Sequence, residues 1–95
     1  MSYSGMKPAR ILVVEDEASQ RRLLCGILRG VKHQVEEADS QEQAESCLAN
    51  DNYDLVISDW KLKSGDGSQL IEHVSRHYPA TSFIMVTVSI CTTNA

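Results

Sequence analysis

The sequence predicts an α/β fold, a parallel sheet with helices on both faces, and three observations support this. Short apolar runs typical of strands alternate strictly with amphipathic segments typical of helices, in the order β-α-β-α-β-α-β. Two of the strands, at 11–14 and within 53–59, are apolar without a polar alternation, as expected of parallel strands buried on both faces. The 95 residues suffice for one domain with a limited core and exclude a second domain.

The first strand is expected from residue 11, where ILVV ends abruptly in the acids EDE. A helix is expected over 18–29, with Gly30 available as its C-cap. Its apolar residues recur at the spacing of one helical face: Leu23, Leu24, Ile27 and Leu28. The segment 32–39 offers only Val35 and Ala38 as inward-facing side chains, which favours a strand at the edge of the sheet.

The second half of the chain repeats the alternation. A helix is expected over 40–51, because Ser40 precedes Gln43 by three residues in a capping box. Its apolar side is formed by Ala44, Cys47 and Leu48. A fully apolar strand at 53–59 follows, then a helix at 68–78 that Pro79 stops and a third buried strand at 81–90. The inward side of that last helix is formed by Leu70, Ile71 and Val74.

Composition limits the function. A formal net charge of −4 with scattered basic residues argues against a nucleic-acid surface. Three cysteines without a C-x-x-C spacing argue against disulfides or a zinc site and suit a cytoplasmic protein. The sequence has neither an apolar run of membrane-spanning length nor a signal peptide. Residues 1–9 are expected to be a flexible leader, 10–89 the domain, and 90–95 an unstructured or non-native tail.

Acids follow two of the predicted strands. In open parallel sheets the functional crevice lies beyond the carboxyl ends of the strands. This rule places Glu15, Asp16 and Glu17, then Asp59, and finally Thr87 at one rim of the sheet. Carboxylates gathered at one edge repel one another unless a cation or a shared proton relieves them. We favour the interpretation that these acids bind a hard divalent cation such as Mg²⁺. In this interpretation Asp59 is a nucleophile in phosphoryl transfer.

Each of these residues also has an ordinary structural interpretation. The EDE acids could be solvated turn residues, Asp59 a loop cap and Thr87 a plain strand residue. Asp66-Gly67 is a turn signal whatever the function. His73 and His77 lie four apart on one helix face but lack an evident third metal ligand, so a solvated face is the simpler reading. The joint placement of the acids on one rim favours function.

Together, ILVVEDE, the aspartate of DLVISDW, the GDG turn and the threonine of FIMVT resemble the receiver domain of bacterial two-component response regulators. The similarity covers residues 9–89 in the right order. It implies a flavodoxin-like three-layer sandwich with strand order 2-1-3-4. A complete receiver continues through a fourth helix, a fifth strand with a lysine and a fifth helix. No lysine follows Lys63 here, so the resemblance implies a C-terminally truncated receiver.

The resemblance also implies the roles of the site residues. Asp59 would accept a phosphoryl group from a phosphohistidine of a sensor histidine kinase or a phosphotransfer protein. Asp16, Asp59 and the backbone carbonyl of Lys61 would bind Mg²⁺, and Glu15 would act through a coordinated water. Thr87 would contact the phosphoryl oxygens and act as the switch.

The chain is therefore expected to be a phosphoacceptor signalling module and not an enzyme, impaired by truncation. The alternative is a pseudo-receiver that binds protein partners without accepting phosphate. An aspartate-nucleophile phosphohydrolase would need an acid two residues after Asp59, where Lys61 stands. Loss of the last helix is expected to bare one sheet face near the first and third strands and to cause self-association, as a homodimer, through that face or through the open edge of the fourth strand. No membrane or nucleic-acid partner is expected.

Overall fold

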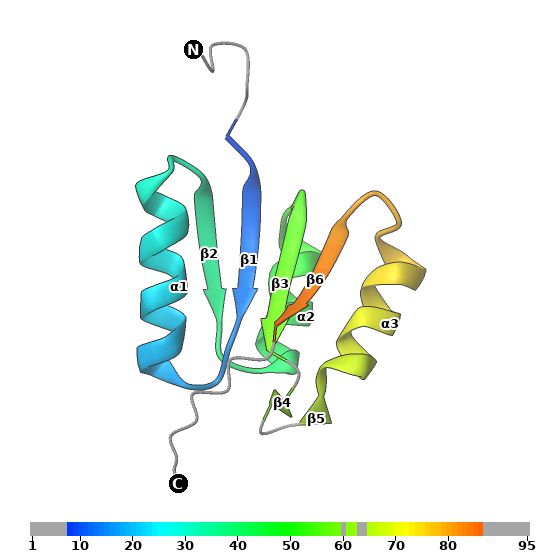
Figure 1. Cartoon of the computed structure of the whole chain (residues 1–95). Coiled ribbons are helices and arrows are strands. Elements are labelled where there is room, and N and C mark those ends of the chain that lie inside the picture. Colours follow the sequence, from blue (N-terminus) through cyan, green and yellow to red (C-terminus); the bar gives the residue numbers. More distant parts are fainter. Residues whose placement is uncertain (1–7, 60, 63–64, 87–95) are drawn as a thin grey trace, which may run out of the picture.

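A four-stranded parallel sheet with α-helices on both faces forms the domain (Figure 1). The computed structural model describes residues 8–59, 61–62 and 65–86. The strand order is β2-β1-β3-β6. The strands are β1 (Arg10–Val14), β2 (Gln34–Ala38), β3 (Leu55–Asp59) and β6 (Ser82–Val86), and the helices are α1 (Ala18–Gly30), α2 (Gln41–Asn50) and α3 (Gly67–His77). This arrangement confirms the predicted α/β class and the order 2-1-3-4.

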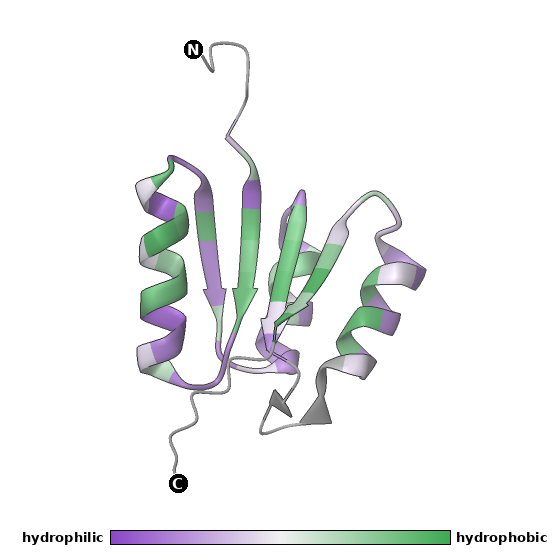
Figure 2. Ribbon diagram, viewed as in Figure 1, coloured by the Kyte–Doolittle hydropathy of each residue, from purple (hydrophilic) through white to green (hydrophobic). Residues whose placement is uncertain are grey.

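The two central strands are the apolar ones. The side chains of β1 are buried from Ile11 to Val14, and those of β3 from Val56 to Ser58. Figure 2 shows both strands as hydrophobic and β2 as mixed. Strand β2 pairs only with β1 among the described strands, which confirms its predicted place at an edge.

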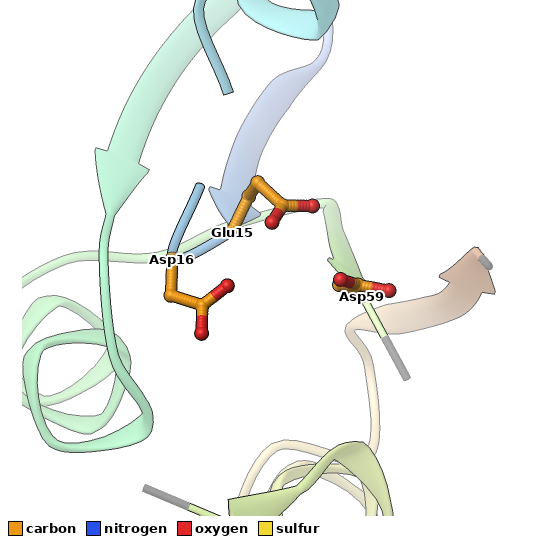
Figure 3. A group of neighbouring side chains, drawn as sticks. All are labelled: Glu15, Asp16 and Asp59. Atoms are coloured by element: carbon orange, nitrogen blue, oxygen red, sulfur yellow. The ribbon is translucent and has the colours of Figure 1, made fainter. Parts of the chain in front are cut away.

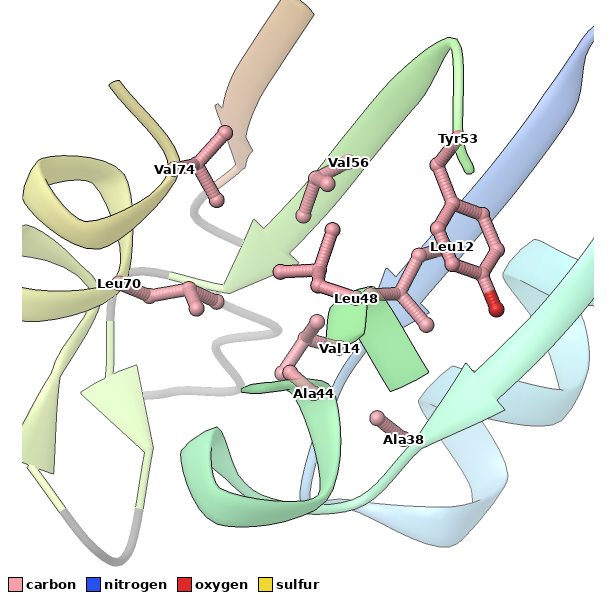
Figure 4. Packing of buried hydrophobic residues seen from close by; sticks show 9 residues of the cluster. All are labelled: Leu12, Val14, Ala38, Ala44, Leu48, Tyr53, Val56, Leu70 and Val74. Atoms are coloured by element: carbon pink, nitrogen blue, oxygen red, sulfur yellow. The ribbon is translucent and has the colours of Figure 1, made fainter. Parts of the chain in front are cut away.

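Helices α2 and α3 cover one face of the sheet. Their inward side chains Leu48, Leu70 and Val74 pack against Leu12 and Val56 in the larger core cluster (Figure 4). Leu70 and Val74 are fully buried. The predicted apolar sides of both helices are confirmed except at Ile71, which is only half-buried and is not among the residues of either core cluster.

Helix α1 covers the opposite face alone among the described elements. Cys25 is fully buried there against Ile11, Val13 and Ile57. Leu24 and Leu28 pack around this smaller cluster. The prediction that Leu23 and Ile27 share this inward face is wrong, because they are 68% and 59% exposed.

Among the described residues, the exposed large apolar side chains lie on α1, at its C-cap and on β6, not on the first and third strands as predicted. Ile84 of β6 is 50% exposed, although 81–90 was expected to form a buried strand. In the described part of the chain, β6 pairs with β3 on one side only, and no described helix covers Ile84 on the α1 side. Residues 87–90 of the predicted strand lie outside the described residues.

Several element ends differ in detail from the prediction. Gly30 is the last residue of α1 and not its cap, because Val31 takes the C-cap position and Lys32 adopts the left-handed conformation with φ 73°. Ser40 caps α2 by accepting a hydrogen bond from the Gln43 backbone N–H. The Gln43 side chain, however, accepts from Asp39 N–H at 2.7 Å, so the reciprocal half of the box is displaced by one residue.

A short hairpin follows the central strand β3, and the described cysteines are unpaired. The segment after β3 contains the short antiparallel strands β4 (Lys61–Leu62) and β5 (Gly65–Asp66). The thiols of Cys25 and Cys47 are both free. Among the described residues no helix has the length and apolarity needed to span a bilayer.

Candidate functional site

Three carboxylates converge at the carboxyl ends of the two central strands. Glu15 and Asp16 directly follow β1, and Asp59 ends β3. One ligand oxygen from each of the three residues lies within 4.8 Å of those of the other two. Figure 3 shows the three side chains at the same rim, although they come from segments more than 40 residues apart. The predicted convergence of these three acids is therefore observed.

The strand register explains the convergence. Val14 of β1 pairs with Ser58 of β3, so the residues that follow each of them emerge side by side. The Glu15 backbone N–H continues the ladder to β2 by donating to the Ala38 carbonyl at 3.0 Å. Two central strands thus end at the same level, and the acids after them have to share one small volume.

Glu15 is the most deeply buried of the three acids. It is only 3% exposed, and Glu17 N–H donates to its Oε2 atom at 3.0 Å. Burial, followed by the negative charges of Asp59 and Asp16, raises the pKa of Glu15 to about 7, and the hydrogen bond from Glu17 opposes this only in part. A carboxyl group with this pKa holds or releases its proton near neutral pH, depending on whether a cation is present.

The other predicted site residues are placed only in part. Lys61 lies in β4, opposite Asp66. Thr87 lies outside the described residues, so its predicted role stays a prediction. His73 and His77 have ring centroids 4.7 Å apart on α3. In the described ranges, only Glu15, Asp16 and Asp59 bring three metal-ligating atoms together, so the histidine pair has no third ligand.

Sequence reasoning missed one residue that contacts the site. Arg21, on the second turn of α1, donates from Nη1 to the Glu15 backbone carbonyl at 2.7 Å and from Nε to Glu37 at 3.2 Å. An arginine among the polar residues of an amphipathic helix reads as solvated. Its position six residues after Glu15, on the turn that faces back over the β1–α1 loop, is the signal that could have identified it.

A comparison with known protein families identifies the family of the domain that carries these acids. The model of the response regulator receiver domain matches residues 11–94. The chain belongs to this family. Receiver domains are signalling domains and not classical enzymes. The prediction that this chain is a receiver-type signalling domain is therefore confirmed. The match contains β1, β3 and the three acids at their ends.

Sequence relatives are longer proteins. The chain is 42% identical over 67 residues to the phosphate regulon transcriptional regulatory protein PhoB of Escherichia coli (strain K12), covering 70% of this chain and 29% of PhoB. It is 30% identical over 82 residues to the response regulator protein PilR of Pseudomonas aeruginosa, covering 86% of this chain and 18% of PilR. The chain thus spans less than a third of the length of these relatives.

Solved receiver domains share the fold. The non-phosphorylated HemR receiver domain of Leptospira biflexa superposes with a TM-score of 0.79 at 31% identity, covering 90% of this chain and 68% of that domain. A CheY-like receiver domain protein of Methanospirillum hungatei gives a TM-score of 0.82 at 27% identity, again covering 90% of this chain and 68% of the other.

The acids fit the cation that the family implies. Mg²⁺ prefers hard oxygen ligands, is held by one or two carboxylates and keeps several waters. Glu15, Asp16 and Asp59 offer carboxylate oxygens only, and these lie within 4.8 Å of one another. Burial, and after it the negative charges of Asp59 and Asp16, raise the pKa of Glu15, so its ionised form is unfavourable beside the other two acids. A divalent cation would offset the repulsion among the three carboxylates.

Proposed function

We propose that this chain is a phosphoacceptor module of a two-component phosphorelay, with Asp59 as the acceptor. The observation that carries the proposal is the convergence of Asp59 with Glu15 and Asp16 at the rim of a receiver fold. Asp59 is partly exposed at the end of a central strand, whereas Glu15 is buried. Of these two carboxylates, only Asp59 is thus accessible to a phosphodonor.

In the proposed reaction a carboxylate oxygen of Asp59 attacks the phosphorus of a phosphohistidine on a sensor kinase or phosphotransfer protein. The P–O bond forms as the P–N bond breaks, and the imidazole leaves with the electron pair of that bond. The product is an acyl phosphate on Asp59.

Asp16, Asp59 and the Lys61 backbone carbonyl would hold Mg²⁺, and Glu15 would act through water. The bound cation would neutralise charge on the incoming phosphoryl group. Thr87 would contact the phosphoryl oxygens.

The test is phosphorylation by a small donor. The protein is incubated with Mg²⁺ and acetyl phosphate, and its intact mass is measured before and after treatment with hydroxylamine, which cleaves acyl phosphates. We expect one phosphoryl group on the unaltered protein and none on Asp59→Asn. Asp54→Asn is the matched control, because Asp54 is an exposed acid just before the opposite end of β3. A label that survives Asp59→Asn would refute the assignment.

A second function, protein binding without phosphate, is favoured by a separate observation. Leu23 and Ile27 on α1 and Val31 at its C-cap follow one another at intervals of four residues and are 68%, 59% and 59% exposed. We call these three residues the outer stripe. Spacing by four places Leu23 and Ile27 on one side of the helix, and Val31 directly follows the end of the helix, so that a partner could cover the three together. Mg²⁺ binding without labelling by any donor would favour this function.

We further propose that the outer stripe, with the exposed Ile84 of β6, mediates self-association. Sedimentation velocity over a range of concentrations is expected to show a dimer. Ile27→Lys, which places a charge in the stripe, should shift the protein to monomer. Ser46→Lys introduces the same charge at an exposed position on α2, across the sheet, and should leave the dimer intact. An unaltered protein that stays monomeric at high concentration would refute this proposal.

A further inference from the structure

Arg21 connects three elements at the edge of the acid cluster. Its side chain is 20% exposed, so the guanidinium is largely enclosed. From α1 it reaches the Glu15 carbonyl in the β1–α1 loop at 2.7 Å and Glu37 on β2 at 3.2 Å. A planar guanidinium with several fixed donors can serve both acceptors at once, which a lysine ammonium does less well.

The bond to the Glu15 carbonyl fixes a peptide group that matters for the site. This carbonyl belongs to the peptide bond that joins Glu15 to Asp16. Because a peptide group is planar, holding its oxygen also sets the direction in which the Asp16 Cα leaves. The preceding peptide group is already held, since Glu15 N–H donates to the Ala38 carbonyl at 3.0 Å. Arg21 therefore completes the fixation of the backbone that carries two of the three acids.

Arg21 is itself held in place. Its partner Glu37 also pairs with Arg29, whose Nη1 lies 3.2 Å from Glu37 Oε2. Arg29 donates in addition to a backbone carbonyl, that of Val35, at 3.1 Å. The two arginines thus make the same kinds of contact with the same acid, and they differ in which backbone carbonyl they hold.

We propose that Arg21 is a positioning residue for the cation site: by holding the Glu15–Asp16 peptide group it orients the Asp16 carboxylate toward Asp59. This inference rests on the proposed function. Partners that orient metal ligands without touching the metal typically change metal affinity by roughly 10–100-fold when they are removed. A residue that only stabilised the fold would change the free energy of unfolding and leave the affinity of the folded protein unchanged.

The test compares Arg21→Met with Arg29→Met. Methionine keeps most of the aliphatic chain and removes every donor, and each variant loses one ion pair with Glu37. The dissociation constant for Mg²⁺ alone is measured by calorimetric titration. The free energy of unfolding is measured in urea with a chelator present. We expect the Mg²⁺ dissociation constant to rise about tenfold or more in Arg21→Met and to stay within about twofold in Arg29→Met.

A third variant tests rescue. Arg21→Lys keeps the charge and can donate to one acceptor but not span both, so its dissociation constant should lie between those of the unaltered protein and Arg21→Met. Should Arg21→Met fail to fold, Arg21→Lys takes its place, and an unchanged dissociation constant there would count against the inference.

The outcomes separate this inference from the function on which it rests. Equal weakening in both methionine variants would overturn it, because the effect would then arise from Glu37 and not from the Glu15 carbonyl. Unchanged Mg²⁺ affinity in Arg21→Met would overturn it while leaving labelling at Asp59 intact. Failure of the unaltered protein to bind Mg²⁺ would overturn both the inference and the metal-dependent part of the proposed function.

Discussion

Glu15 makes the stability of the metal-free protein depend on pH in a direction opposite to that of most acids. In the unfolded chain a glutamate releases its proton near its ordinary pKa of 4.5, whereas burial and the neighbouring Asp59 and Asp16 raise the pKa of folded Glu15 to about 7. The folded state therefore binds this proton more tightly. The stability that protonated Glu15 contributes is fully present below pH 4.5 and is lost as the pH rises to about 7.

The size of the effect follows from the two pKa values. A pKa difference of one unit corresponds to about 1.4 kcal/mol, so a rise from 4.5 to about 7 corresponds to roughly 3 kcal/mol. Little screening by water is expected, since Glu15 is 3% exposed. Small domains are stable by only about 5–15 kcal/mol, so this single ionisation accounts for a considerable share.

The assay is urea unfolding with a chelator present at several pH values between 4.5 and 8, comparing the unaltered protein with Glu15→Gln. Glutamine keeps an oxygen that can accept from Glu17 N–H and has no proton to lose. The stability of Glu15→Gln relative to the unaltered protein should therefore increase by roughly 3 kcal/mol across this range. Glu17→Gln, at an exposed position, is the control for the effect of replacing a glutamate in this loop. Parallel stability curves for the Glu15→Gln and unaltered proteins would refute the reasoning.

Three further predictions concern the cation, the core and a helix cap. Mg²⁺ should raise the melting temperature of the unaltered protein, and a chelator should reverse this; in Asp16→Asn the rise should be much smaller, and an equal rise would place the cation elsewhere. Leu70→Ala should lower the free energy of unfolding by about 2–5 kcal/mol, because Leu70 is fully buried in the larger core cluster; a loss below about 1 kcal/mol in urea titration would contradict that packing. Ser40→Ala should cost about 1 kcal/mol through loss of the 3.1 Å bond from Gln43 N–H, whereas Ser46→Ala at an exposed position within α2 should be nearly neutral.

The central sheet and the acid rim could be predicted because two simple rules act on strong signals. Continuous apolar runs identify strands buried on both faces, and β1 and β3 are those strands. Parallel strands place the residues at their carboxyl ends along one edge of the sheet. This rule was enough to predict that Glu15 and Asp59 lie close together. These inferences need no knowledge of individual side-chain contacts.

The failures occurred where the outcome depends on a neighbour that periodicity cannot reveal. The spacing of Leu23 and Ile27 shows that α1 has a broad apolar side, but half of that side finds no covering element among the described residues. Ile84 is exposed for the same reason, although its strand is as apolar as β3. Arg21 was missed because an arginine on a polar helix face is usually solvated; its spacing from Glu15 was a usable signal, but its second partner, Glu37, is a distant acid that spacing does not reveal.

Helix α1 links the two proposed properties of the chain. Arg21 on this helix holds the loop that carries Glu15, and the outer stripe begins two residues later on the same helix, at Leu23, and ends at its C-cap. The acids themselves lie at the ends of β1 and β3, and no residue of the stripe is among them. If Ile27→Lys abolishes the dimer and leaves the Mg²⁺ affinity unchanged, contacts within a single chain are sufficient to hold Arg21 in place. If the same substitution also weakens Mg²⁺ binding, the placement of α1, and through Arg21 that of Asp16, depends on a second chain.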